Sequence, residues 1–184
     1  FKQLFNSKVP ITSPEQMKGM KFRAAAGGIL TEQFEVLGAT NVSIPFAEVY
    51  TALQQGTIDG SENSWSNIAT QKFYEVSPYI TITNHGRFDY TIATNKEFWD
   101  SLTEEQQNII RDAIQKAQDY SVQLVAETDS QYMEEVKASP NVQMIELTEE
   151  QRNAFRAAVE KMYPEWESRI GSDLFQAALN QNQQ

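Results

Sequence analysis

Residues 21–60 alternate between short apolar runs and segments in which apolar residues recur every three or four positions. Short apolar runs are typical of buried strands, and the helical spacing predicts one face of an amphipathic helix. The expected elements are strand 21–24, helix 28–37, strand 41–44, helix 45–56 and strand 57–60. This order favours a parallel sheet with helices on its faces and a ligand crevice at the carboxyl ends of the strands. The pattern therefore predicts an α/β fold.

The remainder of the chain is expected to be mainly helical. Three capping boxes, in which a serine or threonine precedes a glutamine by three positions, begin helices at Ser13, Thr103 and Thr148. The helix after Thr103 keeps its apolar spacing to about residue 138, and Asn95 caps a short helix before it. The other expected elements are strands 79–83, 89–94 and 143–146 and a last helix at 172–178. Residues 1–10 are expected to be the tail of a preceding segment, without a strand partner.

Arg23 is the first candidate for binding chemistry. It lies near the end of a predicted strand, and Gly27 and Gly28 follow it and free the backbone to begin a helix nearby. A planar guanidinium at such a place can hold a carboxylate by two parallel hydrogen bonds. The polar residues 59–63 are expected on a loop after another strand, at the same edge. The alternative is that Arg23 is a surface residue of an edge strand.

Composition restricts the classes of partner. The chain has 15 basic and 25 acidic residues and a net charge of −10, which argues against nucleic acid or an anionic membrane surface as a partner. It has no cysteine and one histidine, so neither a thiolate site nor a multi-histidine metal site is expected. No apolar run approaches the roughly 20 residues of a membrane-spanning helix. The chain begins at Phe1 without methionine, which is expected of a processed protein or a fragment and leaves the compartment open.

Several segments, in their order and spacing, resemble the solute-binding proteins of TRAP transporters, which are extracytoplasmic receptors for organic acids. The segments that carry the resemblance are Lys-Gly-Met-Lys-Phe-Arg at 18–23, Leu-Gly-Ala at 37–39, Pro-Phe-Ala-Glu-Val-Tyr-Thr-Ala-Leu-Gln-Gln-Gly at 45–56 and Ile-Asp-Gly-Ser-Glu-Asn at 58–63. The similarity continues through 72–76 and 83–85 to the C-terminus. Residues 64–68 and 84–90 are most similar to dicarboxylate-binding members.

The resemblance implies functional residues. The arginine that pairs with the ligand carboxylate corresponds to Arg23, the supporting asparagine to Asn63, and the aromatic residue that packs on the ligand to Phe46. Asn67 and His85 are further predicted ligand-binding residues. Many family members have valine and proline after the arginine, whereas this chain has alanines, so the pocket wall there is not predicted.

The same side chains allow other interpretations. Phe46 has the spacing of a core residue, and Asn63 could cap a helix beginning near residue 64. Glu48 and Glu62 could act as paired acid-base groups, but hydrogen bonds to loops or to the arginine are favoured, since a free carboxylate would repel an anionic ligand. His85 is expected to be structural rather than a general base, because no nucleophile accompanies it.

The resemblance also implies an architecture and a role. The expected fold is a periplasmic-binding-protein-like (type II) lobe, with a mixed or parallel sheet flanked by helices and a long helix that spans the hinge. Residues 1–88 and 128–184 are expected to form the second ligand-binding lobe, and 89–127 the hinge or a first-lobe segment, with most of the first lobe absent. The predicted role is that of a periplasmic receptor that captures a small organic acid, with a C4-dicarboxylate favoured over a 2-hydroxy or 2-oxo acid, and delivers it to a TRAP permease. No cofactor, metal or direct membrane insertion is expected. An enzyme acting on organic acids, and a helical interaction module, are the alternatives.

Overall fold

A computed structural model describes residues 1–25 and 27–181, and its centre is a mixed six-stranded sheet. In the sheet β2 pairs in parallel with β3 and β4, and β5 pairs in parallel with β6. Strand β1 lies between β4 and β5 and is antiparallel to both. The strands, in sheet order, are β3 (Thr40–Ser43), β2 (Lys21–Ala24), β4 (Gly60–Ser64), β1 (Lys2–Asn6), β5 (Tyr79–Ile82) and β6 (Gln143–Glu146). The predicted order of strand, helix, strand, helix and strand, with parallel pairing, is confirmed, but the third strand lies at 60–64 and not at 57–60.

Strand β1 corrects the expectation that residues 1–10 are an unpartnered tail. All five of its residues are buried, and its backbone pairs with a strand on each side. Three of the five, Lys2, Gln3 and Asn6, are polar, so the segment has no apolar alternation. A polar side chain can be buried when it finds a hydrogen-bond partner. Here Lys2 donates to Glu62, Gln3 to Asn84, and Asn6 to the carbonyl oxygen of Val9. Local pattern therefore could not identify this central strand.

Strand β4 begins where the predicted strand 57–60 was expected to end. Of the residues predicted as a loop, 59–63, all but the first belong to the strand, and Ser61, Glu62 and Asn63 are at most 2% exposed. Gly60 allows close packing at the start of the strand, since a Cβ there would lie 2.6 Å from the Phe5 carbonyl oxygen. The polar residues that suggested a loop therefore form a strand, and their side chains bond to neighbouring elements of the protein.

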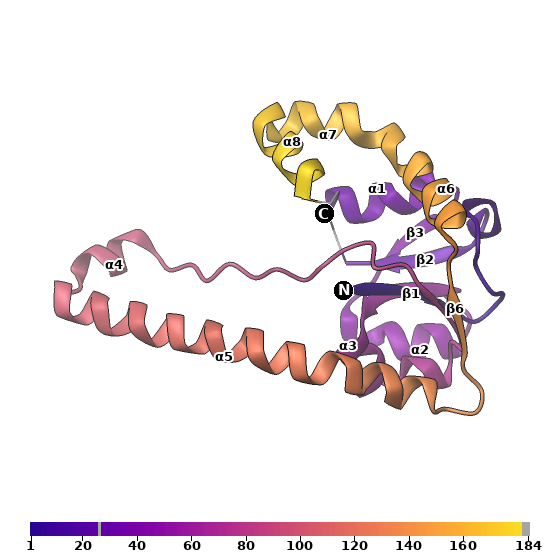
Figure 1. Cartoon of the computed structure of the whole chain (residues 1–184), viewed down its shortest axis with the longest axis horizontal. Helices are drawn as coiled ribbons and strands as arrows, with labels where there is room; N and C mark the ends of the chain where they lie inside the picture. The colour runs from indigo at the N-terminus through magenta and orange to yellow at the C-terminus, as the bar shows by residue number, and fades with distance from the viewer. Residues whose placement is uncertain (26, 182–184) are drawn as a thin grey trace.

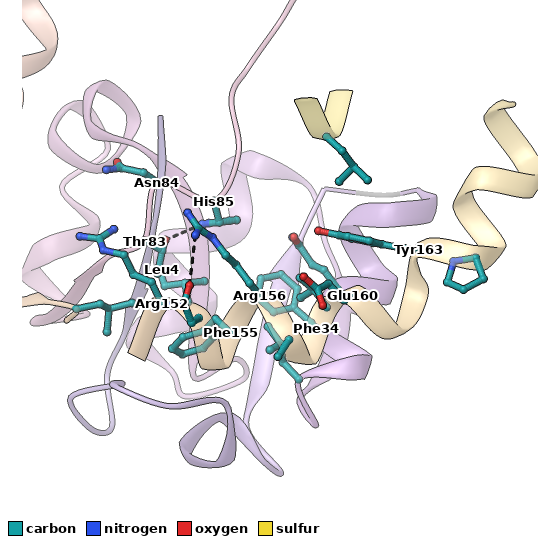
Figure 2. Close-up of a pocket in the computed structure, with 18 of the residues that line it drawn as sticks. Leu4, Phe34, Thr83, Asn84, His85, Arg152, Phe155, Arg156, Glu160 and Tyr163 are labelled. Carbon is teal, nitrogen blue, oxygen red and sulfur yellow. Dashed lines mark hydrogen bonds between the residues drawn. The ribbon is translucent and has the colours of Figure 1, made fainter. Parts of the chain in front are cut away.

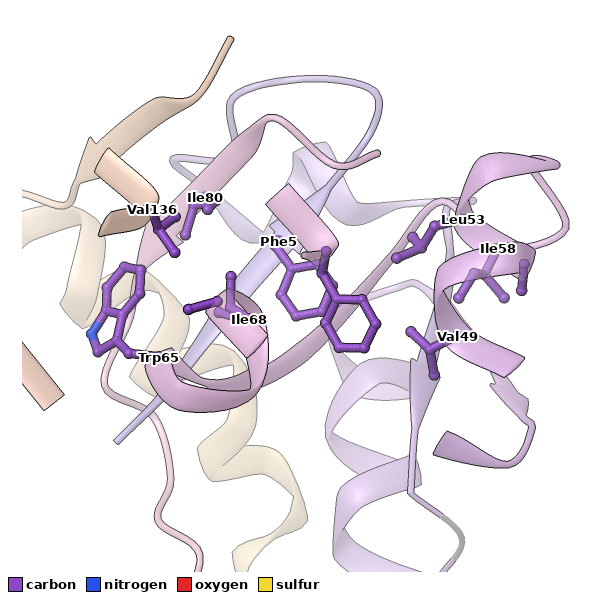
Figure 3. Close-up of a cluster of buried hydrophobic side chains, with 11 residues drawn as sticks. Phe5, Val49, Leu53, Ile58, Trp65, Ile68, Ile80 and Val136 are labelled. Atoms are coloured by element: carbon purple, nitrogen blue, oxygen red, sulfur yellow. The ribbon is translucent and has the colours of Figure 1, made fainter. Parts of the chain in front are cut away.

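Helices cover both faces of the sheet (Figure 1). On one face Phe5 and Ile80 pack with residues of α2, α3 and the end of α5, including Trp65 and Val136 (Figure 3). On the other face the ring of Phe22 stacks on Phe34 of α1 with centroids 5.1 Å apart, and α6 packs alongside. The helices are α1 (Gly28–Val36), α2 (Val49–Gln54), α3 (Trp65–Thr70), α4 (Lys96–Ser101), α5 (Glu104–Lys137), α6 (Glu149–Val159), α7 (Tyr163–Ile170) and α8 (Ser172–Gln181).

The predicted helix starts after Thr103 and Thr148 are confirmed, because each threonine accepts a hydrogen bond from the backbone of a glutamine in its capping box. Asn95 caps α4 in the same way, with its Oδ1 3.0 Å from the Phe98 nitrogen. Helix α5 runs for 34 residues and ends one position before the predicted end. It is long and polar, and none of the helices in residues 1–25 and 27–181 is both long and apolar enough to cross a membrane.

Residues 83–95, here called the strap, leave the sheet after β5 and lead to α4 at the far end of the molecule (Figure 1). Helix α5 then returns from α4 to the sheet. The predicted strand 89–94 is wrong, because the strap has no regular secondary structure and no described strand pairs with it. Tyr90 is 87% exposed and Ile92 is 66% exposed, so β-branched residues alone did not suffice to form a strand without a pairing partner.

Candidate functional site

The predicted binding residues lie at or near one edge of the sheet. Strands β2, β3 and β4 are parallel and end at the same edge, and β5 ends there too because β1 is antiparallel to both β4 and β5. Arg23 and Asn63 are the penultimate residues of β2 and β4, and His85 follows the end of β5. This is the edge at which α/β sheets place ligands.

Arg23 is a nearly buried cation, only 7% exposed. Its Nε donates a hydrogen bond to the Ile44 carbonyl oxygen at 3.1 Å, which orients the guanidinium. Within the described residues neither Nη donates a hydrogen bond, and no carboxylate forms an ion pair with the side chain. Burial lowers the pKa of Arg23, and the charge of Glu62 partly offsets this effect. Since a buried charge is normally paired, the side chain is suited to an anion that completes its hydrogen bonds.

Asn63 lies on the same face of the sheet as Arg23. The register pairs Arg23 with Ser61, and alternate residues of a strand share a face, so Asn63 points in the same direction as Ser61. The Oδ1 of Asn63 accepts hydrogen bonds from Asn67 Nδ2 at 2.6 Å and from the Ser64 nitrogen at 3.1 Å. Its Nδ2 donates to no described residue. The alternative role as an N-cap is wrong, because Ser64 is the N-cap residue of α3.

Phe46 begins a short 3-10 helix (Phe46–Glu48) just after Ile44, whose carbonyl holds Arg23. Its ring packs edge-on against Phe73 of the core, with centroids 5.8 Å apart. It is nevertheless 38% exposed. Phe46 is therefore not the core residue that its helical spacing predicted, because it touches the core at Phe73 and leaves part of its apolar surface exposed.

His85 belongs to a second cluster on the opposite face of β4. Its Nε2 lies 3.4 Å from Glu62 Oε2, and its Nδ1 lies 2.7 Å from Thr83 Oγ1. Glu62 is 1% exposed and also pairs with Lys2, whose Nζ lies 3.0 Å from its Oε2. Burial raises the pKa of Glu62, but the hydrogen bonds and charges of His85 and Lys2 outweigh this, so its pKa lies below the ordinary value. This ion pair accounts for Glu62 without acid-base chemistry.

Sequence patterns did not single out Lys2. It is 3% exposed, and its ammonium lies 4.4 Å from the centroid of the Phe88 ring in the strap. Its backbone nitrogen also donates to the Gly86 carbonyl oxygen at 2.8 Å. A lysine in a segment expected to be a tail carries no signal of burial, because its partners lie 60 or more positions away.

An open groove of about 1090 Å³ lies on the face of the sheet opposite Arg23, against α1, α6 and α7 (Figure 2). Of the predicted binding residues only His85 lines it. The described residues contain no cluster of three or more histidine, aspartate or glutamate side chains suited to a metal ion. The buried charge of Arg23 and the amide of Asn63 are suited to bind a small anion at the sheet edge.

Comparison with known proteins identifies the class. The family described as bacterial extracellular solute-binding protein, family 7, also called DctP, matches residues 1–169. The chain is 37% identical over 179 residues to the C4-dicarboxylate-binding periplasmic protein DctP of Shewanella loihica. The match covers 97% of this chain and 53% of that protein. It is 36% identical over 169 residues to the ectoine-binding periplasmic protein TeaA of Halomonas elongata, covering 90% of the chain and 50% of TeaA.

A solved structure shows the same fold. The TRAP periplasmic solute-binding protein of Shewanella oneidensis with bound succinate superimposes with a TM-score of 0.92 at 35% identity, over 97% of this chain and 58% of that one. The chain belongs to the DctP family of TRAP solute-binding proteins and has their periplasmic-binding-protein-like α/β fold, as its sequence predicted. Members of this family are transport receptors, not enzymes. The chain spans about half the length of the curated relatives it matches.

Proposed function

We propose that this chain contributes to a periplasmic receptor that captures a small organic acid through an ion pair with Arg23 and delivers it to a TRAP permease. The observation that carries the proposal is the burial of the Arg23 guanidinium without a carboxylate partner among the described residues. An anion bound there would receive two Nη donors whose geometry matches a carboxylate. The family supports the class of receptor.

We propose that Asn63 donates its unused Nδ2 hydrogens to the same ligand. Asn67 fixes that orientation by donating to Asn63 Oδ1 at 2.6 Å, and it lies beside the ligand as a further polar contact. The exposed part of Phe46 supplies an apolar contact. His85 stays a predicted ligand-binding residue, and its bond to Glu62 places it on the other face of the sheet.

We also propose that residues 1–88 and 128–184 form one lobe and that residues 89–127 belong to the hinge or the other lobe. Support comes from the projection of the strap, α4 and the first part of α5 away from the sheet (Figure 1). Exposed apolar side chains on this projection, including Tyr90, Ile109 and Tyr120, are suited to be covered by further protein.

A C4-dicarboxylate is the ligand that we propose. Three of the relatives are described as C4-dicarboxylate-binding DctP proteins, and the Shewanella oneidensis structure holds succinate, although others in the family are described as binding ectoine or sialic acid. Arg23 can neutralise one carboxylate, and neutral donors or another lobe would bind the second.

Competition binding on a two-lobed receptor that contains these 184 residues tests the ligand class. We expect succinate and malate to bind at least about tenfold more tightly than pyruvate, lactate and ectoine, a difference of about 1.4 kcal/mol. Preference for pyruvate or lactate by the same factor would contradict the proposed dicarboxylate ligand, while the proposed ion pair with Arg23 would stand. Preference for uncharged solutes would contradict the anchor as well.

The 184-residue chain alone should bind succinate more weakly than the two-lobed receptor. It offers one wall of the site, so water continues to compete for the guanidinium and contacts from the other wall are missing. Isothermal titration calorimetry should give a dissociation constant above about 1 µM, which corresponds to roughly −8 kcal/mol. Submicromolar binding by this chain would contradict the two-lobe proposal.

A further inference from the structure

The groove on the face opposite Arg23 has the size of a ligand site. Its volume of about 1090 Å³ compares with the roughly 300–1,000 Å³ of small-molecule pockets. It is walled by α1, α6, α7 and α8 and by the start of the strap, so its lining comes from widely separated parts of the chain. Of the ligand-binding residues in the proposed function, only His85 lines it.

Two arginines of α6 give one end of the groove a positive charge. Arg152 and Arg156 are four positions apart, so they lie on the same face of the helix and their charges repel. Neither forms an ion pair within the described chain, and the one hydrogen bond between their guanidinium groups and another described residue joins Arg156 Nη1 to Asn153 Oδ1 at 3.3 Å. His85 and Asn84 line the same side of the groove (Figure 2). An anion between the arginines would relieve their repulsion.

Gln33 adds an independent observation. Its side chain lines the groove from α1, and its Nε2 is buried without a hydrogen-bond partner among the described residues. A buried donor without a partner costs free energy, so such groups in native proteins usually meet a protein atom, a water or a ligand. A polar atom of a ligand in the groove could accept this hydrogen bond.

The rest of the groove restricts the ligand to one negative group. Phe155, Val159 and Tyr163 are partly exposed and provide apolar walls near the arginines. Glu160 and Glu167 line the groove near Tyr163, and Glu167 already accepts a hydrogen bond from Ser172 Oγ at 2.5 Å. These carboxylates would repel a second anionic group. A dicarboxylate is thus poorly suited to this groove, in contrast to the site at Arg23.

We propose that the groove is a second ligand site, which binds a small amphipathic monocarboxylate. The carboxylate lies between Arg152 and Arg156, and the apolar body packs against Phe155 and Tyr163. Gln33 donates to a polar atom of the ligand. This site is separate from the proposed succinate site, because the two lie on opposite faces of the sheet.

Titration of the 184-residue chain with 3-phenylpropanoate, followed by saturation-transfer NMR and calorimetry, tests the proposal. The double variant Arg152→Gln/Arg156→Gln should bind the probe at least about tenfold more weakly, as expected when a charged partner of a carboxylate is removed. The neutral amide of the probe should bind the wild-type chain more weakly than the probe itself, by a similar factor. Gln33→Leu should weaken binding severalfold.

Matched variants identify the site. Arg111→Gln, which removes an arginine from exposed α5, and Arg23→Ala should both leave the affinity for 3-phenylpropanoate unchanged. Succinate should not displace the probe. Circular dichroism confirms that each variant is folded, and Gln33→Leu provides a second test should the double variant unfold. Equal binding of the amide, or full affinity in the folded double variant, would overturn the proposal. Displacement of the probe by succinate, together with loss of probe affinity in Arg23→Ala, would also overturn it, since the probe would then occupy the site at Arg23.

Discussion

Arg23→Ala should nearly abolish binding of the organic acid to a two-lobed receptor containing these residues. Loss of one partner of a buried charge pair commonly costs about 2–5 kcal/mol, or roughly thirtyfold to several-thousandfold in affinity. Arg23 is only 7% exposed, so water would compensate little for the lost contact. Arg23→Lys should lose nearly as much, because an ammonium cannot form two parallel bonds from one planar group. Calorimetry with succinate measures both effects.

Lys21→Ala is the matched control for Arg23. Lys21 lies two residues earlier in β2 and is exposed, so its removal changes the net charge equally without touching the proposed site. Its affinity for succinate should stay within about twofold of the wild type, since exposed charges are screened by salt. Unchanged affinity in both Arg23 variants would remove this residue from the site and would contradict the proposed ion pair.

Glu62→Gln should cause a large loss of stability. Glu62 and Lys2 are 1% and 3% exposed, and their charged atoms lie 3.0 Å apart. Removing one partner of a buried ion pair typically costs about 3–5 kcal/mol, because the other charge stays buried without compensation. Urea unfolding followed by circular dichroism measures the change in the free energy of unfolding. Glu48→Gln, at an exposed position, should change this free energy by less than about 0.5 kcal/mol.

A second substitution separates the ion pair from side-chain packing. Lys2→Met/Glu62→Gln should be less destabilised than the sum of the single variants, since it leaves no buried charge unpaired. Additive losses would show that the two side chains do not stabilise each other, and would contradict the role given to Glu62.

The same carboxylate predicts a pH dependence. The folded-state pKa of Glu62 lies below the ordinary value of 4.5, because His85 and Lys2 outweigh the effect of burial. Its contribution to stability is therefore present above about pH 4.5 and is lost as the pH falls through the folded-state pKa. Between pH 5 and pH 3 the wild type should lose more free energy of unfolding than Glu62→Gln. Parallel pH curves for the two proteins would contradict the shift.

Local sequence determined the elements whose signals lie within a few positions. The helices after Thr103 and Thr148 begin where their capping boxes predicted, since a capping box joins residues three positions apart. The parallel order of β2, β3 and β4 followed from the spacing of apolar residues in 21–60. Strand β2 has the predicted bounds, 21–24, so the predicted position of Arg23 near a strand end is confirmed.

Tertiary structure alone decided the elements that depend on distant partners. Strand β1 and the first residues of β4 are rich in polar side chains, and they are buried because each finds its counterpart across the sheet, as Lys2 does with Glu62. Residues 89–94 have strand-forming composition but remain irregular in the absence of a pairing strand among the described residues. Likewise, the local sequence pattern places Arg23 near a strand end, but only packing buries its charge. Hydrogen bonding and desolvation depend on neighbours in space. When these neighbours are far apart in the chain, the local sequence pattern does not reveal them.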